Sequence, residues 1–224
     1  MKSNSEIRKE SRSFLSGKWG SAVAVTIVYL LILYAYTFVG MLLGALLGAI
    51  IFPDDFVAIQ AFTQIFTLIP AILIGFPLFL SHPMLFLSSV RGDKELAVGN
   101  MFQAFKAPYY TKSMGLYLLI TIFTYLWALL LFVPGIIKSL SYQLAPFIIA
   151  DNPTLSANEA IEQSMKMMKG HKMQLFLMNL GIVGLMLLSA VALFIPMLWI
   201  QPYWQTILAK FYEDVKSEYN SASC

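Results

Sequence analysis

Long uncharged apolar segments alternate with short polar segments along the whole chain. Three apolar regions can be delimited in this way: 21–90, 115–150 and 173–209. An uncharged run of about 18 or more apolar residues is typical of a transmembrane helix. The pattern therefore predicts an all-α fold, a polytopic membrane helix bundle.

The first apolar region is long enough for two membrane crossings. Residues 21–52 carry no charge, and as one straight helix they would measure about 48 Å against a hydrocarbon core of about 30 Å. Asp54 and Asp55 separate this segment from 56–90, which several prolines interrupt. We therefore expect two tilted, kinked or partly re-entrant helices.

The second and third apolar regions each predict a hairpin of two helices. In the second region, 115–132 and 136–150 are joined by a tight turn at 133–135. In the third region, 173–194 is followed almost directly by a span from 196 to about 208. The chain is therefore expected to contain about six transmembrane helices, arranged as three hairpins.

The polar segments before the hairpins carry signals for surface helices. Three residue pairs have the spacing of a capping box, in which each side chain bonds the other residue's backbone amide: Ser3 with Glu6, Asn100 with Gln103, and Ser156 with Glu159. Gly17 and Gly170 are expected to end the first and third helices. We expect these helices, within 1–19, 91–112 and 151–172, to be amphipathic and to lie in the membrane interface plane.

Prolines mark a pattern that we interpret as a threefold repeat. When Pro83, Pro146 and Pro202 are aligned, the same order recurs: capped helix, apolar span, short outer turn, proline-bearing span and polar return. The match lies in pattern more than in identity, and the first hairpin is longer than the other two.

Basic residues gather in the polar segments of one side. Of the 15 Lys and Arg residues, five precede the first span, four lie in 91–112, three in 166–172 and two after residue 209; only Lys138 remains. By the positive-inside rule, this bias predicts that both termini face the cytoplasm. Residues 1–224 then form a single membrane domain that ends in a cytoplasmic tail, 210–224.

Composition narrows the class of activity. Of the 224 residues, 58% are hydrophobic and 12% are charged, whereas about 25% charged is usual in soluble domains. The single cysteine, Cys224, allows no intramolecular disulfide and no cysteine-based metal site. The spans hold no carboxylate for a proton relay, and neither a phosphate-binding GxxxxGK[ST] motif nor an acid–base grouping occurs. The residues favour a non-enzymatic protein without cofactor, metal or nucleic-acid partner; His82 is expected to be a hydrogen-bonded packing residue.

A basic cluster follows the third surface helix: Lys166, Lys169, His171 and Lys172. Each such charge near an anionic membrane surface adds about 1 kcal/mol to binding. Lys18 and Trp19 likewise stand where a basic residue and an indole prefer to lie, at the headgroup level. These residues are candidates for binding lipid headgroups, although basic residues also flank the cytoplasmic ends of spans in most membrane proteins.

Lys138 is the basic residue inside an apolar span, and Ser141 and Tyr142 fall on the same helix face. An intramembrane charge suggests a functional site, here for an anionic headgroup or solute. Two plainer alternatives remain open. The side chain can snorkel to the nearby interface, or it can pair with Asp54 or Asp55 at the outer face.

Three glycines form a GxxxGxxxG motif on one face of the first span: Gly40, Gly44 and Gly48. In lipid, such a motif permits close approach of two helices. The partner helix belongs either to the same chain or to a second copy in a homo-oligomer.

Four stretches of the chain resemble the bacterial membrane-protein family catalogued as domain of unknown function 975: RSFLSGKWGSAV at 12–23, PGIIKSLSYQLAPFIIADNP at 134–153, LSANEAIEQSMKMMKGHKMQLF at 155–176 and QPYWQTILAKFYEDVK at 201–216. The resemblance implies a polytopic protein of the bacterial cytoplasmic membrane. It implies no activity, cofactor or catalytic residue.

Together these patterns predict an uncharacterised, non-enzymatic membrane scaffold or modulator. It would bind anionic lipid or a membrane partner at the cytoplasmic face. The alternative is a transporter or channel-like component with a solute site near Lys138, because carriers place binding sites where transmembrane helices are broken.

Overall fold

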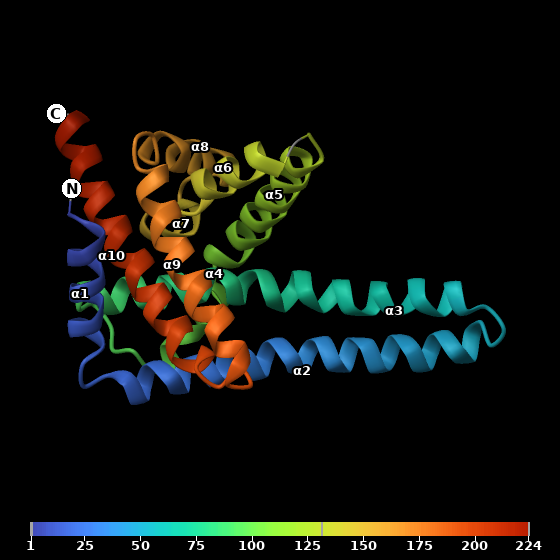
Figure 1. Ribbon diagram of the computed structural model, residues 1–224. Coiled ribbons are helices and arrows are strands. Elements are labelled where there is room, and N and C mark those ends of the chain that lie inside the picture. Colours follow the sequence, from blue (N-terminus) through green and yellow to red (C-terminus); the bar gives the residue numbers. More distant parts are fainter. Residues whose placement is uncertain (1, 131, 224) are drawn as a thin grey trace.

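A computed structural model describes residues 2–130 and 132–223, which form helices and connecting turns with no strand among them (Figure 1). This confirms the all-α prediction. In chain order the helices are α1 (Asn4–Leu15), α2 (Trp19–Ile51), α3 (Phe56–Pro70), the π-helix η1 (Ala71–Gly75), α4 (Phe76–Arg91), the 3₁₀-helix η2 (Val98–Phe105), α5 (Tyr109–Leu130), α6 (Phe132–Tyr142), α7 (Ala145–Asp151), α8 (Ala157–Met167), α9 (Lys172–Val191) and α10 (Met197–Ser223).

Within the described ranges, five helical segments are long and apolar enough to cross a membrane: Trp19–Ile51, Phe56–Arg91, Tyr109–Leu129, Val133–Asp151 and Lys172–Val191. The chain is therefore a multi-pass membrane protein. The sixth predicted crossing, 196–208, forms the first half of α10. It is not among the five, because its apolar part measures only about 20 Å before the helix continues into charged residues.

The first hairpin forms a long arm that projects from the rest of the molecule (Figure 1). In this arm, α2 runs beside a continuous helix made of α3, η1 and α4. Pro70 ends α3 and is followed by the π-helical turn at Ala71–Gly75. A proline lacks an amide hydrogen and crowds the preceding turn, and a wider π-turn accommodates such a defect without ending the helix.

The three motif glycines lie in the seam between α2 and α3. An ideal Cβ at Gly40 would stand 2.6 Å from the carbonyl oxygen of Phe66, and one at Gly44 would stand 2.6 Å from the Cα of Thr63. At Gly48 the corresponding distance, to the Cα of Ile59, is 3.2 Å. Any larger residue at Gly40 or Gly44 would push the backbones apart, so the motif serves packing within the chain.

The second hairpin reverses earlier than the sequence suggested. The predicted turn residues, 133–135, belong to the first turn of α6 rather than to a loop. Proline is tolerated there because amides in the first turn of a helix have no intrahelical partner. Gly135 brings α6 close to α5, since a Cβ on it would lie 3.3 Å from the Cα of Ala128.

The third hairpin pairs α9 with α10, and the segment 210–223, expected as a polar tail, continues α10 as a helix. Five residues of α10, of which the last three belong to this segment, recur at helical spacing and are buried: Ile207, Leu208, Phe211, Tyr212 and Val215. The C-terminal half of α10 therefore packs into the protein. It also returns to the N-terminus, where the backbone amide of Lys2 donates to Asp214 Oδ2 at 2.7 Å.

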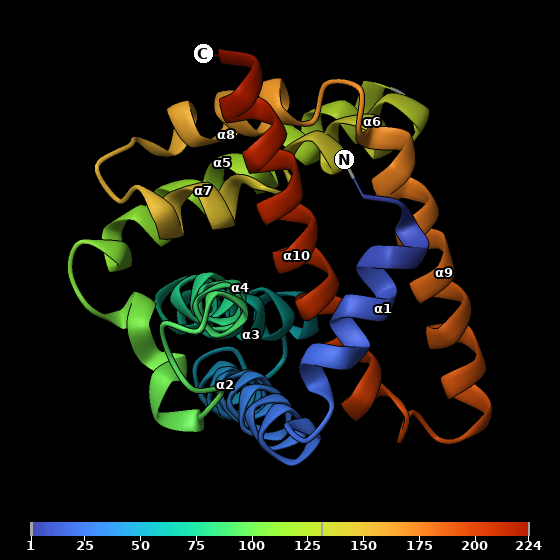
Figure 2. The same ribbon diagram turned by 90° about the vertical axis from the view of Figure 1, so that its left-hand side faces the viewer.

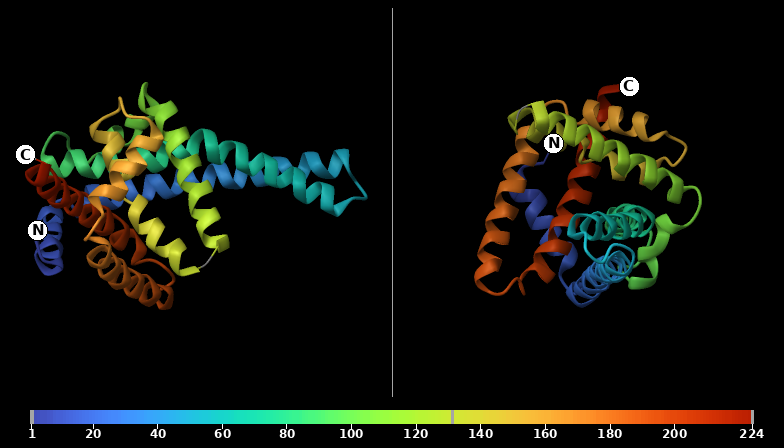
Figure 3. Two further views of the ribbon diagram at one scale, coloured as in Figure 1. Left: turned by 90° about the horizontal axis from the view of Figure 1, so that it is seen from above. Right: turned by 90° about the vertical axis from the view of Figure 1, so that its right-hand side faces the viewer.

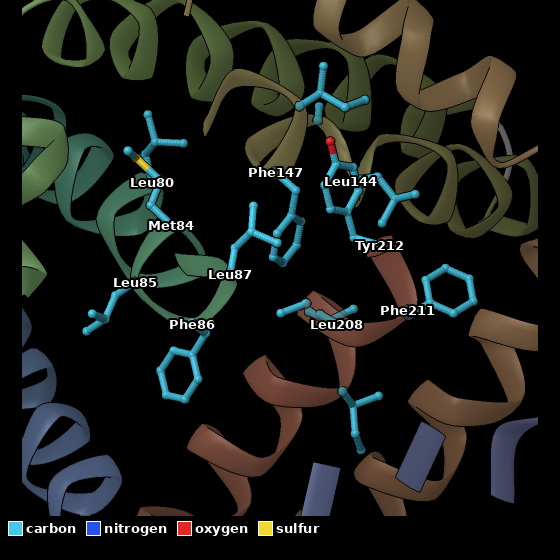
Figure 4. Close-up of a cluster of buried hydrophobic side chains, with 14 of the residues drawn as sticks. Leu80, Met84, Leu85, Phe86, Leu87, Leu144, Phe147, Leu208, Phe211 and Tyr212 are labelled. Carbon is cyan, nitrogen blue, oxygen red and sulfur yellow. The ribbon is translucent and has the colours of Figure 1, made fainter. Parts of the chain in front are cut away.

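The central core forms where the second helices of the three hairpins meet (Figure 4). It combines side chains of α4, the α6–α7 region and α10, among them Phe86, Phe147 and Tyr212. The rings of Phe147 and Tyr212 stack with centroids 5.4 Å apart. Pro83, Pro146 and Pro202 are all buried in these helices, while the threefold repeat itself stays a prediction.

From this core the hairpins leave in different directions. Figures 1 and 3 show the α2–α3 arm pointing away from the α5–α6 and α9–α10 turns. Large apolar side chains stay exposed along each hairpin, for example Leu31, Leu129 and Leu187. Such continuous apolar surface is stable against lipid rather than water.

Two of the three predicted capping boxes are confirmed, at Ser3 with Glu6 and at Ser156 with Glu159. The third is wrong. Ala97 occupies the cap position of η2, and Gln103 instead donates its side-chain amide to the carbonyl oxygen of an Asn100 that already lies inside the helix. The polar segment 91–112 thus holds a short 3₁₀-helix instead of a capped α-helix.

The apolar stripes of the surface helices face protein. On α1, Ile7 and Leu15 are fully buried where the helix packs on α10. On α8, Ile161 and Met168 are fully buried where the helix lies against α5, α6 and α7. An interfacial helix buries its stripe in the bilayer, so these stripes are not available to lipid.

Candidate functional site

A polar cluster joins the ends of the three hairpins, and we call it the hub. Its members are Arg91 at the end of α4, Asp151 at the end of α7, and Tyr212, Glu213 and Lys216 in α10. Arg91 binds Asp151 with both Nη atoms, and its Nη2 lies 2.9 Å from Asp151 Oδ2. Arg91 Nε also donates to Glu213 Oε1 at 2.9 Å.

Asp151 is the centre of the hub. Its side chain is 12% exposed. Tyr212 Oη and Lys216 Nζ each donate to its Oδ2 at 2.6 Å. Burial raises the pKa of the Tyr212 phenol, and the hydrogen bond to the Asp151 carboxylate raises it further, so the phenol stays protonated as a donor.

The hub contains two cations and two carboxylates, and each of its five side chains bonds to at least one other member. Such an arrangement holds helices in register. The sequence analysis missed it, because Arg91 and Asp151 were noted only as ends of apolar segments. The one available signal was that each of them closes a predicted span.

The candidate headgroup residues fall into two places. Lys166, Lys169, His171 and Lys172 lie together where α8 gives way to α9, and we call this cluster the basic turn. His171 Nε2 lies 3.5 Å from Glu218 Oε1. The side chains of the three lysines make no hydrogen bond or ion pair with any residue that the structure describes.

Lys18 and Trp19 lie at the opposite end of α1 from the basic turn. The start of α1 is next to α9, because Asn4 Nδ2 donates to the carbonyl oxygen of Gln174 at 3.3 Å. Lys18 Nζ stands 4.4 Å from the ring centre of Phe14. Trp19 lines a groove between α1, α9 and α10.

Lys138, Ser141 and Tyr142 are engaged within the protein. Lys138 Nζ lies 4.7 Å from the ring centre of Trp127 and 4.0 Å from Met165 Sδ. Ser141 Oγ donates to the carbonyl oxygen of Ile137 at 2.8 Å, and Tyr142 is buried. Lys138 therefore meets an aromatic ring and the α8 helix instead of the outer acidic loop.

The expected partners of Lys138 are elsewhere. Asp54 and Asp55 lie at the tip of the α2–α3 arm, where Asp55 Oδ1 accepts from the Ala58 amide at 3.0 Å and caps α3. Across the described ranges, no carboxylate lies within ion-pair distance of Lys138. The predicted pairing across the outer face is therefore wrong.

His82 is a packing residue, as expected, but it is not hydrogen bonded. Its ring lies 4.4 Å from that of Tyr29 and 5.1 Å from that of Phe86, measured between centroids. Neither ring nitrogen has a hydrogen-bond partner among the residues described.

A family model with the description "Protein of unknown function (DUF975)" matches residues 1–145 and, in a second overlapping stretch, residues 129–219. The chain belongs to this family. The matched stretches include α1, the hub and the basic turn, so all the sites described above lie in the region shared with DUF975. No curated protein and no solved structure matches the chain.

Proposed function

We propose that this DUF975 protein is a non-enzymatic scaffold of the bacterial cytoplasmic membrane that binds anionic phospholipid at its cytoplasmic face. The observation that carries the proposal is the basic turn, where three lysine side chains share no hydrogen bond or ion pair with the described part of the chain. Unpaired cations at the end of apolar helices are suited to lipid phosphates.

The sidedness of the proposal follows from the two chain ends. The hydrogen bond between Lys2 and Asp214 supports both ends on one side of the membrane, which requires an even number of crossings. We infer that α10 completes a short third hairpin with α9. Because the basic residues gather on the side of the two ends, the positive-inside rule places that side in the cytoplasm.

Binding would be electrostatic rather than by insertion of a helix. The stripes of α1 and α8 are buried against protein, so these helices have no apolar face to give to the bilayer. The three lysines together contribute about 3 kcal/mol at about 1 kcal/mol for each charge. Exposed charges are screened by salt, so this affinity should fall as ionic strength rises.

The structure gives less support to the transport alternative. Lys138 contacts Trp127 and Met165, and the Ser141 hydroxyl is satisfied by its own helix. The polar groups that would line a solute route thus already have partners. The glycine motif is used between α2 and α3, so a homo-oligomer or a membrane-protein partner would need another surface.

The test compares the purified full chain with Lys166→Gln/Lys169→Gln/Lys172→Gln by native mass spectrometry in detergent containing phosphatidylglycerol or phosphatidylcholine. We expect the variant to lose phosphatidylglycerol binding by about 100-fold, from about 3 kcal/mol, with phosphatidylcholine unaffected. Lys166→Arg/Lys169→Arg/Lys172→Arg is the matched control and should bind like the wild type. Wild-type affinity in the glutamine variant, or affinity that does not change between low and high salt, would contradict the proposal.

A further inference from the structure

A groove of about 480 Å³ lies between α1, α9 and α10, away from the basic turn. Figure 2 shows α1 lying between the two helices of the third hairpin. The groove has a basic part formed by Arg8 and Arg12 and an apolar part that includes Leu185 and Trp199. A ligand that fills it must therefore combine an anionic group with an apolar one.

The two arginines have no carboxylate partner. The nearest acidic residue along α1, Glu10, is taken by Lys2 at 2.6 Å and by Lys210 at 3.8 Å. Arg8 is half-buried, and neither guanidinium forms an ion pair or hydrogen bond with any residue in 2–130 or 132–223. A half-buried cation without a counter-charge is costly, so the groove favours an anion.

Arg8 is held against an apolar helix. A Cβ built at Gly181 would stand 2.5 Å from Arg8 Nη2, so a larger residue at 181 would require the end of the Arg8 side chain to shift from this position. Gly181 lies nine residues into α9, about 14 Å from Lys172 along the axis. At that point α9 is a candidate membrane span, and a cation beside it marks a binding site by default.

The apolar part of the groove opens onto the lipid-facing side. Leu185 and Trp199 are both partly exposed there, at 41% and 45%. Trp19 and Tyr203 complete the wall, and tryptophan and tyrosine favour the boundary between headgroups and hydrocarbon. The groove therefore offers both kinds of contact that a phospholipid needs, cations for its phosphate and an apolar wall for its acyl chain.

We propose that this groove binds one anionic phospholipid, with its phosphate between Arg8 and Arg12 and an acyl chain along Leu185 and Trp199. A guanidinium binds phosphate oxygens through two parallel N–H donors, which makes arginine suited to this group. The inference rests on the proposed function in that both concern anionic lipid. It adds a separate site of defined stoichiometry.

The experiment uses the full chain in detergent and dibrominated phosphatidylglycerol, whose bromine atoms quench tryptophan fluorescence at short range. Quenching in the wild type should saturate at one lipid per chain, and it should be lost when both tryptophans of the groove are replaced, in Trp19→Phe/Trp199→Phe. Arg8→Gln/Arg12→Gln should bind about tenfold more weakly or worse, since each charged hydrogen bond contributes about as much as a factor of ten in affinity.

A pair of glycine variants controls for folding. Gly181→Ala should displace Arg8 and weaken the quenching. Gly184→Ala on the same helix should not, because no atom lies within 4 Å of a Cβ at that position. Thermal unfolding midpoints equal to that of the wild type show that the arginine and glycine variants are folded.

The outcomes separate the two proposals. Binding that is lost in Arg8→Gln/Arg12→Gln but kept in the triple lysine-to-glutamine variant supports the groove site. Binding that survives the arginine change and falls with the lysine change keeps the proposed function and overturns the groove. If neither change matters, both are overturned. Inorganic phosphate that competes as well as phosphatidylglycerol would show a phosphate site without a lipid chain, and would also overturn the groove proposal.

Discussion

The hub joins the ends of all three hairpins and the basic turn begins the third, and the two clusters treat charge in opposite ways. In the hub, Arg91 and Lys216 meet Asp151 and Glu213, and the charges cancel within the protein. In the basic turn, three lysines face outward with no counter-charge from the described part of the chain. A cluster of charged side chains therefore indicates a ligand only where the protein itself supplies no counter-charge.

The largest expected effect comes from opening the hub. Asp151→Asn removes the carboxylate shared by Arg91, Tyr212 and Lys216 and leaves partly buried cations without it. We expect a loss of about 3 kcal/mol in unfolding free energy, or about 6–12 °C in the midpoint. Thermal unfolding of the purified protein in detergent measures it.

Asp54→Asn is the matched control, because Asp54 is exposed at the tip of the arm. Its midpoint should equal that of the wild type. A midpoint for Asp151→Asn within 2 °C, on the order of 0.5 kcal/mol, would show that the hub is not a structural clasp. The contrast with the basic turn would then fail.

Removing a single hydrogen bond of the hub should cost less unfolding free energy than Asp151→Asn. Tyr212→Phe removes the hydroxyl that donates to Asp151 but keeps the ring that stacks on Phe147. We expect a loss of about 1.5 kcal/mol, as for a hydrogen bond to a charged acceptor, with lipid binding unchanged. Tyr34→Phe, at an exposed position, provides the comparison, and equal stability of the two variants would contradict the prediction.

Features formed by residues close together in the sequence could be predicted, whereas features formed by residues far apart in the sequence could not. Two of the three capping boxes, and the close helix approach at the glycine motif though not the identity of its partner helix, were readable because each depends on a few residues of one helix. The hub was not, since Arg91 bonds Asp151 and Glu213 across 60 and 122 residues of sequence. The apolar stripe of α8 likewise did not indicate whether lipid or α5 would cover it, because both surfaces are apolar.

The C-terminal half of α10 illustrates the same limit. Its charged residues suggested a tail, while Phe211, Tyr212 and Val215 are spaced to cover one helix face. The sequence pattern alone did not reveal that this face had a protein surface to meet. The unpaired arginines of α1 were likewise visible as basic residues, whereas the groove beside them depends on Gly181 in a distant helix.

The smallest expected effect concerns the exposed carboxylates of the two capping boxes, Glu6 and Glu159, which contrast with the partly buried Asp151 carboxylate of the hub. Hydrogen bonds from Ser156 lower the pKa of Glu159, and those from Ser3 lower the pKa of Glu6, below the ordinary 4.5. The ionised carboxylates therefore stabilise the first turns of these helices fully above pH 4.5. This stabilisation is lost as the pH falls through the lowered pKa of each carboxyl group. Amide hydrogen exchange in the first turns of α1 and α8 should lose protection on acidification.

Glu159→Gln keeps the hydrogen-bonding shape of the box without the charge. In this variant the protection of α8 should no longer depend on pH, while α1 keeps its dependence. Equal protection of wild-type α8 at neutral and acidic pH would show that the capping carboxylate does not support the helix.

The spread of the hub over the sequence also sets an order for biosynthesis. At about 5–20 residues per second, the ribosome makes Glu213 about 6 to 24 s after Arg91, which lies 122 residues earlier. Asp151 follows Arg91 by 60 residues, so during about the first half of that interval the first hairpin enters the membrane with its arginine still unpaired. The clasp closes only when α10 has left the ribosome, so this later helix fixes the positions of the two hairpins inserted before it.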